Sequence, residues 1–149
     1  MIEFISLAII MAIAFFAHFK IMQLKRDHES QYSWDYECRE CLHCIQQEFR
    51  HECESYARKM VSAYCGNKNR YISYPLYTNA LNQYRDAIQI LKNKYTSDIN
   101  KQATERMGKY RAVTIPEYII AEYKRNIEDI TDTFYKFGNF VQDEMPMNK

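Results

Sequence analysis

Five cysteines fall between positions 38 and 65, and the first three are spaced as C-x2-C-x2-C. Thiols at this spacing are typical of zinc sites, iron–sulfur clusters and redox centres. On a helix, such cysteines step around the axis by about 60° each and form a slanted row about 9 Å long, so one helix can offer only two of them to a metal. The weak candidates for a metal site, which would need further ligands from a second copy or a partner, are Cys38, Cys41, Cys44, Cys53 and His51.

Two other interpretations of the cysteines remain open. Cys38 and Cys53 fall on an apolar helical stripe, where a free cysteine serves as a small apolar side chain. Disulfide bonds would instead require an oxidising compartment, and the odd number of cysteines would leave one thiol over. One alternative is therefore that the chain is a thiol-based redox or metal-binding membrane protein. The function that we favour, given at the end of this section, needs no cofactor.

The sequence lacks the motifs of common enzymes. Its three glycines, Gly66, Gly108 and Gly138, are far apart, so they cannot form a glycine-rich phosphate-binding loop. Neither a G-x-S-x-G turn nor an H-E-x-x-H pair is present. The formal net charge of +1 argues against a general nucleic-acid-binding protein, because that function needs a strongly basic face. We therefore expect a protein that is not an enzyme and has no nucleic-acid partner.

The strongest pattern lies at the amino terminus. Residues 2–19 read IEFISLAIIMAIAFFAHF, in which Glu3, Ser6 and His18 are the polar residues. As a helix they span roughly 27 Å, close to the ~30 Å hydrocarbon core of a bilayer, and their large apolar side chains together favour insertion by about 3–6 kcal/mol. This pattern predicts a transmembrane anchor over residues 1–24. The residues expected to contact membrane lipid are Phe4, Leu7, Ile10, Ile13 and Phe16.

Two alternatives fit this segment less well. A cleaved signal peptide would need a basic start and small residues before the cut, but the chain has Glu3 and the run FFA at 15–17. A buried core helix would show a polar face, which residues 4–17 lack. Lys20, Lys25 and Arg26 follow the span, so the positive-inside rule predicts the amino terminus outside and the remaining chain on the cytoplasmic or matrix-equivalent side. An inner or organellar membrane would suit this topology.

Beyond Trp34 the apolar residues recur at intervals of three and four, which is a helical period. This spacing predicts one helix over 34–65, capped by Gly66, a second beginning at Pro75 and interrupted at 96–98, and a last one. The last helix is expected to begin at a capping box from Thr114 to Glu117 and to close at Gly138. Two heptad-like seams result, one with Tyr77, Leu81, Tyr84, Ile88 and Leu91 and the other with Ile120, Tyr123, Ile127, Ile130 and Phe134.

The predicted fold class is all-α, with an N-terminal single transmembrane helix followed by a small bundle of three or four amphipathic helices. The expected divisions are an anchor over 1–24, a juxtamembrane linker or helix extension over 25–33, a bundle over 34–138 and a tail over 139–149. This layout favours a structural, assembly or adaptor subunit of a membrane-associated complex. Its seams would pack against other subunits, a second copy or helices of the same chain. A third possibility is a small virus- or phage-encoded protein acting on host membranes or factors, because the isoleucine-rich, valine-poor composition suggests an AT-rich coding sequence.

Overall fold

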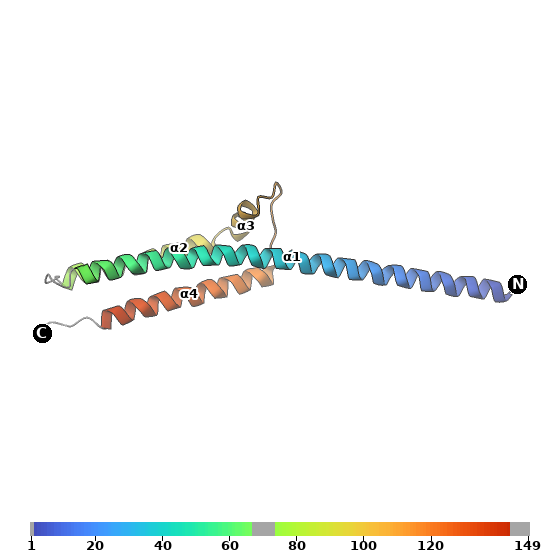
Figure 1. Cartoon of the computed structure of the whole chain (residues 1–149), viewed down its shortest axis with the longest axis horizontal. Helices are drawn as coiled ribbons and strands as arrows, with labels where there is room; N and C mark the ends of the chain where they lie inside the picture. The colour runs from blue at the N-terminus through green and yellow to red at the C-terminus, as the bar shows by residue number, and fades with distance from the viewer. Residues whose placement is uncertain (1, 67–73, 144–149) are drawn as a thin grey trace. The chain divides into compact units, whose positions relative to one another are not determined.

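The structure, a computed structural model, describes the backbone of residues 2–66 and 74–143 and the side chains of residues 11–63 and 78–143. Over these residues it is entirely helical apart from short connections, which confirms the predicted all-α fold class. The elements are α1 (Ile2–Gly66), α2 (Tyr74–Thr96), α3 (Ile99–Met107) and α4 (Glu117–Asp143) (Figure 1). The chain divides into two compact units, unit 1 with residues Met1–Glu37 and unit 2 with residues Cys38–Lys149.

Unit 1 is helical from Ile2 onward, so residues 25–33 continue the helix rather than form a separate linker. Among the residues that the structure describes, no helix combines the length and the apolar character needed to cross a membrane. Three of the predicted anchor residues, Phe4, Leu7 and Ile10, lie outside the residues whose side chains are described. The other two, Ile13 and Phe16, are both exposed.

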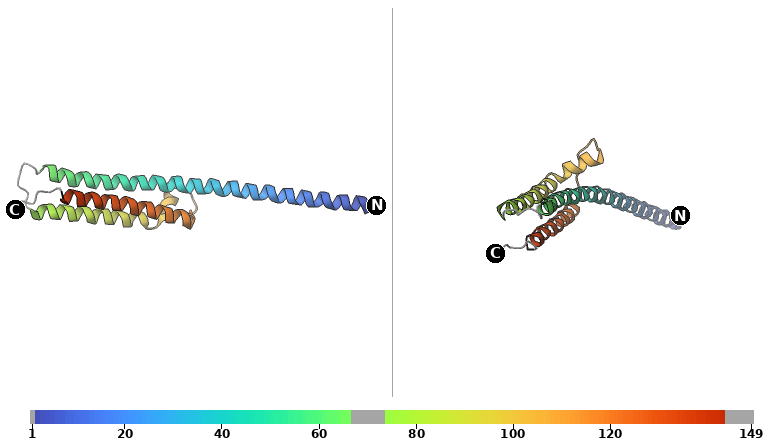
Figure 2. Two further views of the ribbon diagram at one scale, coloured as in Figure 1. Left: turned by 90° about the horizontal axis from the view of Figure 1, so that it is seen from below. Right: turned by 60° about the vertical axis from the view of Figure 1, so that its left-hand side comes forward.

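Unit 2 contains three long helical segments that lie side by side (Figure 2). The shorter α3 contacts α1 where Cys41 meets the carbonyl of Ala103. The polar bridges between α2 and α4 fix their relative direction. Lys92 Nζ lies 2.6 Å from Glu128 Oε1, and Tyr135 donates a hydrogen bond of 2.9 Å to Gln89. Because higher numbers on α4 pair with lower numbers on α2, these two helices are antiparallel.

The bridges between α1 and α4 show the opposite trend. Arg39 forms an ion pair with Glu122, and further along both helices Asn126 donates a hydrogen bond to Gln46. Numbers rise together on the two helices, so α1 and α4 are parallel. For α1 and α4 to run in the same direction, a segment that lies between them in the sequence must run in the opposite direction, and α2 is that segment.

The core of unit 2 is built from one apolar stripe on each long helix, as the spacing predicted. Burial of these stripes is the main favourable contribution to the fold. The largest buried side chains include Phe49 of α1, whose ring centroid lies 5.4 Å from that of Tyr95 of α2. The buried apolar residues of the long helices include Cys38, Leu42, Ile45, Phe49, Cys53 and Met60 of α1, Leu81, Tyr84, Ile88, Leu91 and Tyr95 of α2, and Ile119, Ile120, Tyr123, Ile127, Ile130 and Val141 of α4.

The limits of α4 differ from those predicted. The helix begins at Glu117, where the carbonyl of Pro116 accepts bonds from the amides of Ile119 and Ile120, so the predicted start at a Thr114 capping box is wrong. The predicted end at Gly138 is also wrong, because the helix continues to Asp143. Gly138 is buried inside α4, and its lack of a side chain allows α4 to approach the ring of Tyr84 on α2.

The predicted interruption at 96–98 is confirmed. α2 ends at Thr96, and Asp98 takes a left-handed conformation with φ 45° before α3 begins. α3 ends at Met107, and the glycine that caps it, Gly108, is also left-handed with φ 61°, as is common for a glycine at a helix carboxyl end. The connection to α4 is then fastened to α3 by two side chains. The amide of Val113 donates to Thr104 Oγ1 at 2.8 Å, and the amide of Ile115 donates to Asn100 Oδ1 at 2.9 Å.

Candidate functional site

The candidate residues with nucleophilic or ligating side chains lie on the part of α1 that belongs to unit 2. Cys41 is 8% exposed and faces α3, with its Sγ 4.0 Å from the carbonyl oxygen of Ala103. Cys44 lies one helical turn later and is exposed. Arg106 of α3 interacts electrostatically with both thiols and forms an ion pair with Glu48, one turn beyond Cys44. The two cysteines and Arg106 therefore form one cluster at the α1–α3 contact.

The other cysteines have a different environment. Cys38 and Cys53 are both fully buried in the core of unit 2, in agreement with the interpretation that they serve as small apolar side chains. Burial raises the pKa of the Cys53 thiol to about 12, and the neighbouring carboxylates of Glu52 and Glu54 act in the same direction. Such a thiol stays protonated and unreactive at neutral pH. Cys65 lies outside the residues whose side chains are described.

The structure does not bring the proposed metal ligands together. His51 is exposed on α1, about two turns beyond Cys44, whereas Cys38 and Cys53 point into the core. In the described part of the chain, no group of three or more His, Cys, Asp or Glu side chains is placed to hold a metal ion. The cysteines described there are also not joined in disulfides.

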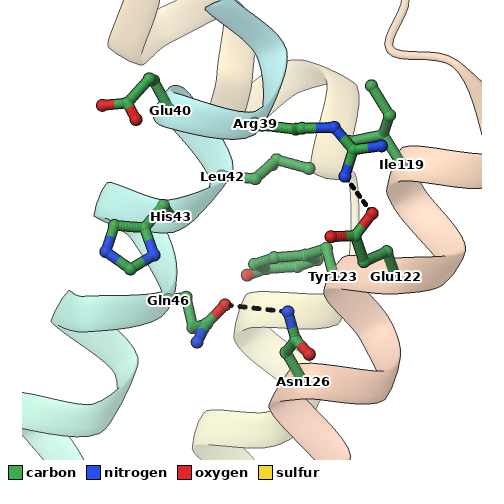
Figure 3. A pocket seen from close by; sticks show the side chains of 9 residues that line it. All are labelled: Arg39, Glu40, Leu42, His43, Gln46, Ile119, Glu122, Tyr123 and Asn126. Atoms are coloured by element: carbon green, nitrogen blue, oxygen red, sulfur yellow. Dashed lines mark hydrogen bonds and ion pairs between the residues drawn. The ribbon is translucent and has the colours of Figure 1, made fainter. Parts of the chain in front are cut away.

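A groove of about 220 Å³ lies between α1 and α4 (Figure 3). Its base is apolar, with Leu42 of α1 and Tyr123 of α4 both buried. Its polar residues bond to one another across the two helices, in the Arg39–Glu122 ion pair and the Asn126–Gln46 hydrogen bond. These bridges hold α1 beside α4.

His43 at the edge of this groove is exposed, and the amide nitrogen of Gln47 lies 3.4 Å from its Nε2. A general base needs a proton donor of the substrate or a nucleophile within hydrogen-bonding reach. The residues that line the groove include no serine, threonine, cysteine or lysine.

Unit 1 carries a long apolar surface on its helix. The side chain of Phe15 is 75% exposed and that of Ile13 is 64% exposed. Further exposed apolar residues continue to the predicted end of the anchor; the set is Met11, Ile13, Phe15, Phe16, Phe19, Ile21, Met22 and Leu24. At 100° per residue these positions are distributed around the whole helix rather than along one stripe. His18, Lys20 and Gln23 are the polar residues within 11–24.

The two predicted seams lie inside unit 2. Of the first seam, Leu81, Tyr84, Ile88 and Leu91 are buried, and the side chain of Tyr77 lies outside the described residues. Of the second, Ile120, Tyr123, Ile127 and Ile130 are buried, and Phe134 is half-buried. The described part of both seams is therefore used for packing within the same chain.

Sequence reasoning did not find Arg106 or Glu48 as neighbours of the cysteines. Glu48 is four residues beyond Cys44, and that spacing could have identified it as a neighbour on the helix surface. Arg106 comes from a different helix, and its position depends on how α3 packs against α1. No local pattern in the sequence specifies that packing.

The chain was compared with known proteins by sequence and by structure. No protein-family model, no curated protein and no solved structure matches it.

Proposed function

We propose that this chain is a non-catalytic membrane-attached protein that serves as a structural or adaptor subunit of a larger assembly. In this proposal the apolar amino-terminal segment crosses the lipid bilayer, and unit 2 is a folded helical body outside it that binds partner subunits. The positively charged residues after the segment favour a body on the cytoplasmic or matrix-equivalent side.

The observation that carries the proposal is the exposure of apolar side chains all around the helix at residues 11–24. In water, such a surface would be covered by another apolar surface, because leaving large apolar side chains exposed is unfavourable. A helix that is apolar on every side is typical of a membrane span or of the centre of a large protein. The sequence of residues 2–10, which is equally apolar, supports the membrane as the apolar environment.

Unit 2 supports the adaptor part of the proposal. Its apolar stripes are filled from within the chain, so it presents a folded surface that is largely polar. Among the described side chains of unit 2, the large hydrophobic ones that remain on this surface are Tyr56, Ile90, Tyr110, Tyr118 and Phe140. Of these, Ile90 of α2, at 66% exposure, and Phe140 of α4, at 59%, carry no polar group. Partly apolar, mostly polar surfaces are typical of contacts between separately folded subunits.

Membrane attachment can be tested by adding charge to the segment. Ile13→Lys combined with Phe16→Lys should disfavour insertion by about 6–8 kcal/mol, which exceeds the insertion energy expected from the sequence. The full-length chain should resist alkaline carbonate extraction from membranes, and this double variant should be extracted. Ser30→Lys with Ser33→Lys adds the same charge to exposed positions of the same helix and should leave attachment unchanged. Extraction of the unmodified chain by carbonate would refute the anchor.

The adaptor role needs a separate experiment. After solubilisation of native membranes in a mild detergent, the chain should migrate in a complex larger than its own detergent-bound monomer. Ile90→Ser and Phe140→Ser should weaken that complex without lowering the helical content, because both side chains lie outside the core. A chain that stays anchored but monomeric, with no partner recovered from its native membrane, would refute this part of the proposal alone.

A further inference from the structure

The cysteine cluster at the α1–α3 contact is not used in the proposed function. Cys44 is exposed to solvent, Cys41 is at the edge of the core, and the two are one helical turn apart. Their common neighbour Arg106 comes from α3 and is held by Glu48. The arrangement therefore combines an accessible thiol, a second thiol within a turn, and a cation that interacts with both.

The guanidinium of Arg106 interacts electrostatically with both thiols. A thiolate is the reactive form of cysteine, and a neighbouring positive charge favours it. Burial raises the pKa of the Cys41 thiol, and the Arg106 guanidinium opposes this effect. Cys44 is exposed to solvent, so dissolved reagents can reach it. Cys38 and Cys53 are both fully buried, so among the described cysteines a dissolved oxidant meets Cys44 first.

We propose that Cys44 and Cys41 form a redox pair that reacts with hydroperoxides and loosens α3 from α1. In the first step the Cys44 thiolate attacks the terminal oxygen of a hydroperoxide. The O–O bond breaks, Cys44 becomes a sulfenic acid, and the alkoxide leaves and takes up a proton to become an alcohol. In the second step the Cys41 sulfur attacks the Cys44 sulfur, an S–S bond forms, and hydroxide leaves with the Cys41 proton as water. Two thiols thus supply the two electrons that reduce one hydroperoxide.

The helix geometry gives this disulfide a structural consequence. Side chains three residues apart on an α-helix have their Cβ atoms about 5–6 Å apart, whereas a disulfide requires about 3.5–4.5 Å. Closing the bond must therefore distort α1 between residues 41 and 44 and draw the Cys41 sulfur away from the carbonyl of Ala103. Ala103 is fully buried in the α1–α3 contact. Oxidation should consequently weaken the attachment of α3, and the strained bond should be easily reduced again.

This inference does not depend on membrane attachment or on a partner subunit. It concerns chemistry within unit 2 and is tested with the purified full-length chain. Trypsin separates the relevant thiols cleanly, because cleavage after Arg39 and Arg50 gives the peptide ECLHCIQQEFR, which contains Cys41 and Cys44 and no other cysteine.

The experiment treats the chain with hydrogen peroxide, alkylates the remaining thiols and analyses the peptides by mass spectrometry. We expect peptide 40–50 to lose both alkylation sites together and to be lighter by two hydrogen atoms, with recovery after dithiothreitol. The peptides that carry Cys38 and Cys53 should remain alkylated. In Cys41→Ser, dimedone should trap a sulfenic acid on Cys44. A dimedone adduct on Cys44 that is equally abundant in the unmodified chain, with no disulfide in peptide 40–50, would overturn the proposal.

Two variants test the part played by the cation. Arg106→Gln should slow the oxidation of Cys44 about three- to tenfold, because it removes the positive charge that interacts with the attacking thiolate. Glu48→Gln, which removes the partner that neutralises Arg106, should accelerate it. Equal rates in both variants would show that the guanidinium has no role in the reaction and would overturn the assigned cluster.

The predicted release of α3 has its own measurement. On oxidation, the amides of residues 99–107 should exchange with deuterium faster, whereas those of residues 123–130 in α4 should be unchanged. Cys41→Ser treated with the same peroxide should show no acceleration, because it cannot form the bond. Unchanged exchange in α3 of the oxidised wild-type chain would refute the structural consequence.

Discussion

Gly138 shows how one missing side chain sets the distance between two helices. A Cβ atom at this position would lie 3.1 Å from Cε1 of Tyr84. The tyrosine cannot move away easily, because it is buried and its hydroxyl donates a hydrogen bond of 2.9 Å to the carbonyl of Phe134. A glycine in mid-helix costs about 1 kcal/mol relative to alanine. Its presence here indicates that close packing against Tyr84 outweighs that cost.

Gly138→Ala should therefore destabilise unit 2, by about 1 kcal/mol net, because overpacking of 1–3 kcal/mol exceeds the gain in helix propensity. Urea unfolding followed by circular dichroism would measure the change. Lys136→Ala, an exposed substitution in the same helix, should be near neutral. The cost of Gly138→Ala should also shrink when Tyr84 is replaced by leucine. An increase in stability on Gly138→Ala would contradict the explanation.

Among the elements, the connection between α3 and α4 depends on hydrogen bonds from side chains to the backbone. The partly buried amide of Ile115 has Asn100 Oδ1 as its acceptor. Asn100→Ala should cost about 1–3 kcal/mol, because it leaves that amide unsatisfied. Hydrogen exchange at Ile115 should accelerate strongly. Lys101→Ala, the exposed neighbour on α3, should change neither stability nor exchange appreciably, and equal effects of both variants would argue against the bond.

Some features of the helices could be predicted from the sequence and others could not. The stripes of α1, α2 and α4 could be predicted because each long helix repeats its apolar residues with a helical period, as at Leu81, Tyr84 and Ile88. The start of α4 could not be predicted in this way. The amide of Ile115, just before the helix, donates its hydrogen bond to Asn100, which belongs to another element. Gly138 was mistaken for a cap for a similar reason. Glycine marks helix ends and close approaches alike, and the position of Tyr84 decides between them.

The candidate site was predicted only in part. The spacing of Cys41 and Cys44 was visible in the sequence, and so was the apolar role of Cys38 and Cys53. The charge beside the thiols was not, because α3 reaches α1 through tertiary packing. The apolar character of the segment in unit 1 was the easiest feature to predict, because it depends on local composition alone.

At the scale of the whole molecule, three buried tyrosines make the stability of unit 2 dependent on alkaline pH. Burial raises the pKa of Tyr84, Tyr95 and Tyr123 well above the ordinary value of about 10, and a hydrogen bond to Glu52 adds to this effect at Tyr95. The unfolded chain therefore loses these protons at a lower pH than the folded chain. Their stabilising contribution is fully present below pH 10 and is lost as the pH rises above it.

Unit 2 should accordingly become less stable above pH 10, by up to about 4 kcal/mol per pH unit if all three tyrosines are involved. Urea midpoints measured at pH 8, 10 and 11 would give the slope. Tyr123→Phe, which removes one of the three groups, should reduce the slope by about a third, although it also removes a hydrogen bond of 2.9 Å to the carbonyl of Tyr95. A midpoint that does not fall above pH 10 would contradict the prediction.

The proposed topology of the whole chain can be tested through its own exposed thiol. In a variant with Cys65→Ser, a membrane-impermeant maleimide should label Cys44 in inverted vesicles and leave it unlabelled in sealed right-side-out vesicles, because the rule for flanking charges places unit 2 inside. Detergent should restore labelling in the second sample. The reverse pattern would place the amino terminus inside and contradict the proposed orientation.

The parallel arrangement of α1 and α4 determines when unit 2 can fold during synthesis. Arg39 and Gln46 have their partners at Glu122 and Asn126, so the apolar stripe of α1 leaves the ribosome long before the helix that covers it. At about 5–20 residues per second, the roughly 80 residues in between take about 4–16 s to be made. During that interval the stripe is open to chaperones and to aggregation, and a nascent chain stalled before residue 117 should bind such factors, whereas one stalled well beyond residue 143 should not.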